Sequence, residues 1–225
     1  MRINVFLLLV AVSLGGFSLS AQTITNQGNG KYSLNVGHVT MTVDASRGGK
    51  IVSYKYDDKE VLSQTRMPNS FGSTFWTSPQ SEWNWPPVPE YDSKPFDVQT
   101  TDAALVLTGE KSKRFGYRVR KEFTTDVKKN AIVITYTIVN ESDETRKVAP
   151  WEISRVPNGG ILFFDAKEAT PANNMKGLPF EYEKKAAWYV LDEAHDHRKI
   201  NADGKGWLAF YDNGLLFVKK FPDLK

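Results

Sequence analysis

The chain has 225 residues, which is long enough for one well-buried domain, and it contains no cysteine. The lack of cysteine excludes disulfide bonds, a thiolate nucleophile, a cysteine zinc site and lipid attachment through a cysteine. The net charge of +3 is small, and the one dense basic run, residues 111–121, has a strand-like pattern. That pattern indicates a solvated surface rather than a nucleic-acid interface.

The N-terminus has the pattern of a secretory signal peptide. Arg2 precedes an apolar run over about residues 5–19, and small residues end at Ala21. The run is shorter than the ~20 residues that a membrane-spanning helix needs, and two glycines interrupt it, which favours a signal peptide over a membrane span. We therefore expect residues 1–21 to be removed and residues 22–225 to form a single domain in the periplasm or outside the cell.

Alternation of apolar and polar residues recurs along the rest of the chain. It is clearest in residues 38–43, 117–125 and 131–140, and the last of these segments is rich in β-branched residues. Turn sequences separate such segments at residues 47–49, 57–58, 129–130, 141–143, 158–160 and 212–214. No window has the apolar stripe of a long helix. The pattern predicts an all-β fold, an antiparallel sandwich.

Residues 72–96, GSTFWTSPQSEWNWPPVPEYDSKPF, contain three of the six tryptophans and five of the eleven prolines. Because proline fixes φ and lacks an N–H donor, we expect neither a helix nor a central strand here but a rigid loop that covers or holds something. Trp83 and Trp85 are two positions apart. In an extended segment both would lie on one side, with Asn84 opposite.

Two longer segments resemble the galactose-mutarotase-like superfamily. VDASRGGKIVSYKYDDKEVL (residues 43–62) is similar to its opening hairpin, and ITYTIVNESDETRKVAPWEIS (residues 134–154) is similar to a long strand and the strand that follows it. The tryptophan loop and residues 206–223 resemble an exported bacterial branch of that superfamily. The resemblance implies an antiparallel β-supersandwich with a sugar-binding concave face. It also implies further strands after residue 225, so a truncated chain would leave residues 215–219 as an unpaired edge.

The resemblance implies that the aromatic rings of this loop stack on a sugar while neighbouring polar groups bind its hydroxyls. The substrate-binding candidates are Trp76, Gln80, Glu82, Trp83, Trp85 and Trp151. The alternative is that the rings close the end of the sandwich and belong to its core.

The superfamily's epimerases use a histidine as general acid and a glutamate as general base on one sugar. Where that histidine is expected, this chain has Pro150-Trp151-Glu152. The catalytic candidates are Glu152, Arg155 and His195. Glu152 could act as the acid if burial beside Trp151 raised its pKa. Alternatively, Glu152 and Arg155 form an ion pair at the strand end.

His195 and His197 lie in the mixed-charge segment 191–199. A His-x-His pair can bind a metal from an extended segment, but no third or fourth ligand is evident, so a polar loop without metal is favoured. The sequence has no Ser-His-Asp signature, no phosphate-binding glycine loop and no H-E-x-x-H motif, and we expect no cofactor.

These patterns leave three functions open. We favour a saccharide-binding protein whose partner is a carbohydrate, with neither nucleic acid nor a membrane span involved. The second is an aldose 1-epimerase-like isomerase that acts at a sugar's anomeric centre. The third is a structural or interaction domain whose tryptophans are core residues. The sequence does not indicate an oligomeric state.

Overall fold

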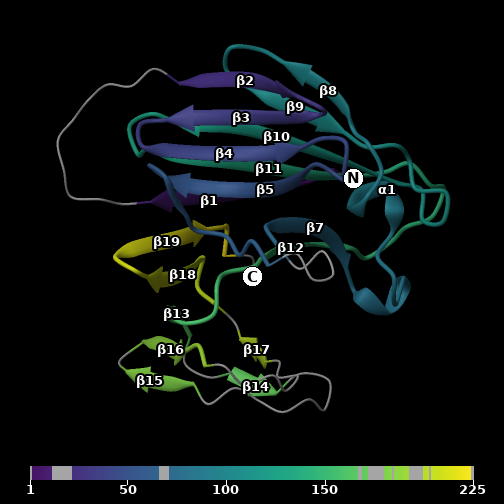
Figure 1. The fold of residues 1–225 in the computed structure, drawn as a ribbon. Helices are drawn as coiled ribbons and strands as arrows, with labels where there is room; N and C mark the ends of the chain where they lie inside the picture. The colour runs from purple at the N-terminus through teal and green to yellow at the C-terminus, as the bar shows by residue number, and fades with distance from the viewer. Residues whose placement is uncertain are drawn as a thin grey trace.

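The computed structural model of the chain describes residues 2–11, 22–65, 71–166, 169–171, 180–183, 185–192, 200–202 and 204–223. Antiparallel strands form two large sheets and a further two-stranded sheet of β14 (Ala169–Pro171) and β17 (Ile200–Ala202), as Figure 1 shows. The predicted all-β antiparallel sandwich is thus confirmed. Among the described residues, no helix is long and apolar enough to cross a membrane.

One sheet has ten strands, in the spatial order β15-β16-β13-β18-β19-β1-β11-β10-β9-β8. In that order the strands are β15 (Glu181–Glu183), β16 (Ala186–Val190), β13 (Ile161–Asp165), β18 (Trp207–Asp212), β19 (Leu215–Lys220), β1 (Arg2–Ala11), β11 (Ala131–Asn140), β10 (Tyr117–Asp126), β9 (Leu105–Thr108) and β8 (Asp97–Thr100). The predicted strands at residues 117–125 and 131–140 are confirmed as β10 and β11.

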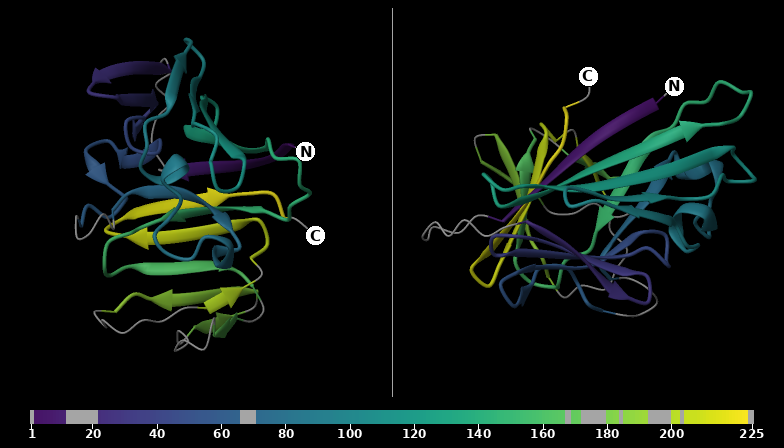
Figure 2. Two further views of the ribbon diagram at one scale, coloured as in Figure 1. Left: turned by 90° about the vertical axis from the view of Figure 1, so that its right-hand side faces the viewer. Right: turned by 90° about the horizontal axis from the view of Figure 1, so that it is seen from above.

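The other sheet has seven strands, in the order β12-β7-β5-β4-β3-β2, with β6 paired to β5. They are β12 (Ala149–Ser154), β7 (Ser73–Ser78), β5 (Lys50–Tyr56), β4 (Val39–Asp44), β3 (Lys31–Val36), β2 (Thr23–Gly28) and β6 (Lys59–Glu60). The two sheets lie face to face (Figure 2). Two short helical turns, η1 (Gln80–Glu82) and α1 (Pro89–Asp92), follow β7.

Alternate residues of the facing strands fill the space between the sheets. Leu34, Met41 and Val43 of the seven-stranded sheet are fully buried, as are Ile132 and Ile134 of β11. This is the alternation that the sequence shows, and each residue on the apolar side faces the opposite sheet. Removal of this apolar surface from water is the main force that holds the two layers together.

Strand β1 lies between β11 and β19. Nine of its residues, 2–10, pair with residues 131–139 of β11, and residues 8–11 pair with residues 217–220 of β19. The expectation of an unpaired edge at residues 215–219 is therefore wrong, because β19 has a neighbour on each side. Strand β1 overlaps the apolar part of the predicted signal peptide, and cleavage after Ala21 would remove it.

Lys121 lies in the core, on the apolar side of β10. Its ammonium group donates hydrogen bonds to the carbonyl oxygens of Gly48, at 2.6 Å, and of Gly49, at 3.3 Å. It also lies 5.2 Å from the ring centre of Phe96. Burial lowers the pKa of Lys121 to about 7, and the negative charge of Asp92 opposes this shift in part.

We predict that the pH dependence of stability will reveal Lys121. Between pH 7 and its ordinary pKa of 10.5, the unfolded chain binds a proton that the folded protein does not, so stability rises with pH. Below pH 7 the ammonium is protonated in both states and the full cost of burying it remains. Lys121→Met should therefore gain stability relative to the parent at pH 6 and lose part of that gain by pH 9, measured by urea unfolding. An equal difference at both pH values would contradict this.

We also predict that residues 22–225 are less stable than the full chain. Without β1, both β11 and β19 would expose backbone hydrogen-bonding groups, and such edges promote association. Thermal melting should show a lower transition temperature for the shorter form, and size-exclusion chromatography should show larger species. Identical melting and identical elution of the two forms would contradict the placement of β1 in the sheet.

Candidate functional site

The site is built on the pairing of β7 with β12, which places Trp76 directly opposite Trp151 and Phe75 opposite Glu152. The Phe75 ring stacks on Tyr136 of the facing sheet, with ring centres 4.4 Å apart, so this side of β7 faces the core. Because neighbouring residues of a strand point to opposite sides, Trp76 and Trp151 lie on the other face.

The expectation that residues 72–96 contain no central strand is wrong for their first part. Residues 73–78 form β7, which lies between β12 and β5. This segment precedes the first proline, Pro79, and consists of aromatic, threonine and serine residues that suit a strand. The irregular loop begins only at Pro79.

The loop sends Trp83 and Trp85 in different directions. Trp83 follows the single turn of η1, and Asn84 has a left-handed backbone with φ of +56°, so the segment is not extended. Trp83 is 3% exposed and Trp85 is 71% exposed. The expectation that both rings lie on one side is therefore wrong. Trp83 is in the core, which agrees with the alternative interpretation of the tryptophan rings as core residues.

The four tryptophans nevertheless form one cluster around Trp76. Its ring centre lies 5.5 Å from that of Trp151, 5.6 Å from that of Trp83 and 6.0 Å from that of Trp85, each in an edge-to-face arrangement. Such edge-to-face pairs are favourable beyond the area they bury. Trp76 itself is 8% exposed, so Trp85 and the partly buried Trp151 supply most of the accessible aromatic surface.

Specific hydrogen bonds fix the loop to the sandwich. The Trp83 indole donates to the carbonyl oxygen of Thr77 at 2.9 Å, and the Trp76 indole donates to the Asp92 carboxylate at 2.7 Å. Arg114 donates to the carbonyl oxygen of Glu82 at 2.8 Å. The turn before β5 packs against α1 so closely that a Cβ on Gly48, with φ of +65°, would overlap the Asp92 carbonyl oxygen.

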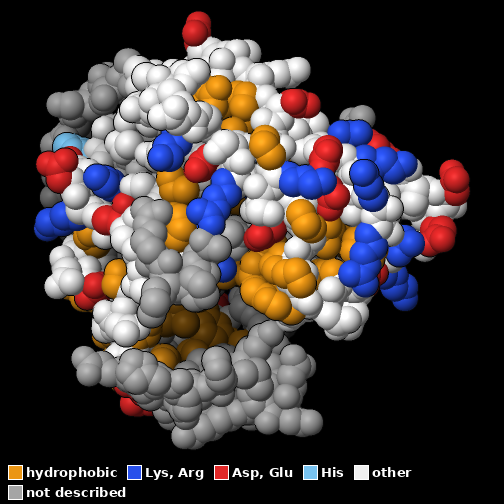
Figure 3. All heavy atoms as spheres, turned by 45° about the vertical axis from the view of Figure 1, so that its right-hand side comes forward, with side chains coloured by type: hydrophobic (Ala, Val, Ile, Leu, Met, Phe, Trp, Pro, Cys, Tyr) orange, Lys and Arg blue, Asp and Glu red, His pale blue; other side chains and the backbone are white. Residues whose placement is uncertain are grey.

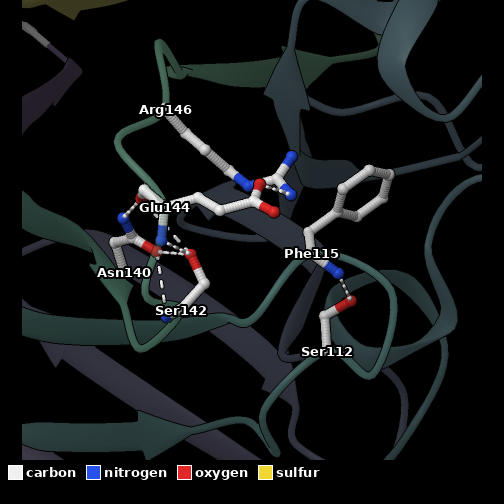
Figure 4. A network of polar contacts seen from close by, with 6 residues as sticks. All are labelled: Ser112, Phe115, Asn140, Ser142, Glu144 and Arg146. Atoms are coloured by element: carbon white, nitrogen blue, oxygen red, sulfur yellow. Dashed lines mark hydrogen bonds and ion pairs between the residues drawn. The ribbon is translucent and has the colours of Figure 1, made fainter.

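A polar turn between β11 and β12 lies beside the segment that carries Ser112 and Phe115 (Figure 4). Asn140 accepts hydrogen bonds from the backbone N–H of Ser142, at 3.1 Å, and from its hydroxyl, at 2.7 Å. The Arg146 guanidinium pairs with Glu144 at 2.5 Å and lies 6.0 Å from the ring centre of Phe115. The charges of Arg146 and of Glu82, which lies in the tryptophan loop, both act on Tyr117, so the turn brings a cation near that loop.

Several enclosed polar atoms lie near one another beneath the loop. Five buried side-chain atoms of the described residues form no hydrogen bond of good geometry, although Thr77 lies close to Tyr91 and Arg146 lies close to Tyr117: Thr77 Oγ1, Glu82 Oε2, Tyr91 OH, Tyr117 OH and Arg146 Nε. Burial raises the pKa of Tyr91 to about 12, and the negative charge of Glu82 contributes to the shift. Burial also raises the pKa of Tyr117, again with a contribution from Glu82. The candidate Glu82 is therefore directed into the protein rather than toward the exposed ring of Trp85.

Glu152 faces the core, on the side of β12 opposite to Trp151. Its carboxylate forms an ion pair with Lys219 of β19, and both side chains are 9% exposed. It also accepts hydrogen bonds from the Ser73 and Ser154 hydroxyls. Burial lowers the pKa of Lys219 to about 7, while contact with the carboxylate favours the ammonium form and acts in the opposite direction. The expectation that Glu152 is buried beside Trp151 is wrong, since alternation along β12 separates them.

Arg155 lies on the tryptophan side, at the end of β12. Its Nη1 donates to the Thr74 hydroxyl at 3.2 Å, and its Cζ lies 5.9 Å from the ring centre of Trp76. The alternative ion pair between Glu152 and Arg155 is wrong, because Glu152 pairs with Lys219 instead. Burial lowers the pKa of Arg155, and the nearby charge of Asp92 partly opposes this.

The remaining predicted site residues, Gln80 and His195, add little to the described site. Gln80 is partly buried, and its carbonyl oxygen accepts hydrogen bonds from the backbone N–H groups of Trp83, at 3.1 Å, and Asn84, at 2.7 Å. His195, with the proposed metal partner His197, lies outside the described residues. Within the part of the chain that is described, no cluster of three or more histidine, aspartate or glutamate side chains could hold a metal ion.

Sequence reasoning missed three groups that shape the site. Asp92 binds Trp76, Arg114 holds the loop, and Lys219 binds Glu152. Arg114 lies in the basic run whose pattern predicts a solvated surface, and that pattern identifies its charge but not its contact with the loop. A signal for Lys219 was its alternation with Phe217 on the apolar side of β19.

No protein family and no curated protein matches the sequence. Among solved structures, the chain is similar to the 4-α-glucanotransferase of Thermococcus litoralis, with 11% identity and a TM-score of 0.41. The match covers 90% of this chain and 41% of the enzyme, so the chain spans less than half the enzyme's length. A likeness at this TM-score assigns neither a fold family nor an activity.

We predict opposite behaviour for the two neighbouring tryptophans. Trp83→Ala should lower stability by ~3–5 kcal/mol, because it removes a buried ring and leaves a cavity. Trp85→Ala should change stability by about 0.5 kcal/mol or less, because the ring is mostly exposed. Urea unfolding of both variants measures this. A large loss for Trp85→Ala, or a negligible one for Trp83→Ala, would show that the roles of the two rings are assigned wrongly.

Proposed function

We propose that the protein binds a saccharide on the surface formed by Trp85, Trp151 and the edge of Trp76. The observation that carries the proposal is the 71% exposure of Trp85 on a loop that is otherwise fixed by buried contacts. A large aromatic ring held in water on a rigid support suits a ligand with an apolar face. The C–H face of a pyranose ring is such a surface.

The surroundings of this surface support the same proposal. Asp92 and Arg155 both contact Trp76 and supply polar groups next to the aromatic rings. Figure 3 shows hydrophobic side chains grouped on one face of the molecule beside Lys and Arg side chains. Saccharide sites combine aromatic stacking with a few polar groups that bind hydroxyls, and the support is pre-formed here.

We propose binding rather than catalysis at this surface. Epimerisation needs an acid and a base on opposite sides of one sugar. Glu152, the leading catalytic candidate, faces the core and is paired with Lys219, so it does not reach a ligand stacked on Trp85. The resemblance of residues 43–62 and 134–154 to galactose-mutarotase-like proteins supports a carbohydrate ligand, and we propose a relationship to that superfamily on those segments.

We also propose that the protein is exported, on the strength of the signal-peptide pattern in residues 1–21. Export with cleavage after Ala21 yields a product that begins at Gln22 and lacks β1. N-terminal sequencing of the protein from its native host tests this. An intact Met1 would contradict it.

The test of the proposed function is a glycan-array screen of the protein, followed by calorimetric titration of the glycan that binds. We predict that Trp85→Ala weakens binding of that glycan at least tenfold while the melting temperature changes little. Tyr211→Ala is the matched control, because Tyr211 is an aromatic residue 45% exposed on β18, in the other sheet. Unchanged binding by Trp85→Ala, or no glycan bound by the parent, would refute the proposed site.

A further inference from the structure

Arg155 joins the tryptophan surface to a polar cavity. The cavity has a volume of about 640 Å³ and is lined by Ser63, Gln64, Thr65, Arg155, Val156, Pro157 and Asn158. This volume lies within the usual range of small-molecule sites. Its lining contains hydroxyl and amide side chains and one cation, with no acidic side chain among the described lining residues.

The backbone around Arg155 is firmly held. Its N–H donates to the carbonyl oxygen of Gly72 at 3.0 Å, and its own carbonyl oxygen accepts from the N–H of Ser63 at 2.7 Å. These bonds connect the end of β12 to the segment before β7 and to one wall of the cavity. The guanidinium group is thus positioned by fixed backbone on both sides.

Most N–H donors of the Arg155 guanidinium group have no hydrogen-bond partner among the described residues. Of its five N–H donors, one bonds to the Thr74 hydroxyl, and among the described residues no carboxylate lies within ion-pair distance of it. Asp92 is the acidic group whose charge acts on it, and the Asp92 carboxylate accepts the Trp76 indole hydrogen bond. A partly buried arginine with spare donors beside an open cavity can bind an anion.

Resting on the proposed function, we propose that the saccharide carries a carboxylate, as in a hexuronic acid, and that Arg155 binds this carboxylate at the mouth of the polar cavity. A planar guanidinium matches the two oxygens of a carboxylate. Trp85 and Arg155 each lie about 6 Å from the Trp76 ring centre, so one or two sugar units can reach both.

The test compares an acidic oligosaccharide with its uncharged methyl ester. Calorimetry measures binding of tetragalacturonate and of its methyl ester to the parent protein. We expect the acid to bind at least tenfold more tightly than the ester, and its affinity to fall as sodium chloride is raised from 50 to 500 mM. Equal affinity for acid and ester, with no salt dependence, would overturn this inference and leave the proposed function standing if Trp85→Ala still weakens binding.

The variants assign the effect to Arg155. Arg155→Gln should weaken binding of the acid about tenfold and leave binding of the ester unchanged, while Arg155→Lys should keep part of the preference. Arg120→Gln is the control, because Arg120 pairs with Glu122 on the other sheet.

An Arg155→Gln variant that folds and keeps the full preference overturns the inference. If Arg155→Gln does not fold, a reduced preference in Arg155→Lys supports the inference, and a fully retained preference with salt-independent binding overturns it. If the parent binds no glycan, both proposals fail together.

Discussion

The pairing of β7 with β12 is the constraint on which the site depends. In this register Phe75 and Glu152 share one face and Trp76 and Trp151 share the other. The first face is tied to the opposite sheet by the stacking of Phe75 on Tyr136 and by the ion pair to Lys219. The second face is therefore free to carry the aromatic surface. A slip of one residue would exchange the two faces and bury the tryptophans against the core.

The loop after β7 turns that surface into a rigid platform. Trp83 is enclosed and hydrogen-bonded, so it works as an anchor, and the positive φ of Asn84 directs Trp85 outward. A platform that is fixed before binding loses little conformational entropy when a ligand stacks on it. The buried ion pair of Glu152 and Lys219 lies behind this surface and connects the two sheets. This separation of roles is the physical basis for proposing a binding site rather than a catalytic one.

The strands and turns were predictable because alternation and turn chemistry are local properties, as residues 117–125 and 131–140 show. The opposite fates of Trp83 and Trp85 were not, because they follow from one helical turn and one left-handed residue inside a proline-rich segment. The partner of Glu152 was not predictable either. Lys219 lies 67 positions away on the other sheet, and only the packing of the sheets brings them together.

The most direct test of the account follows the six tryptophan indole N–H signals by NMR while the glycan found in the array is added. Single Trp→Phe substitutions assign the signals. The account predicts that the signals of Trp85, Trp151 and Trp76 shift on binding, while those of Trp188 and Trp207, on strands of the other sheet, stay in place. Shifts confined to Trp188 and Trp207 would contradict the account, because they would place the ligand on the ten-stranded sheet.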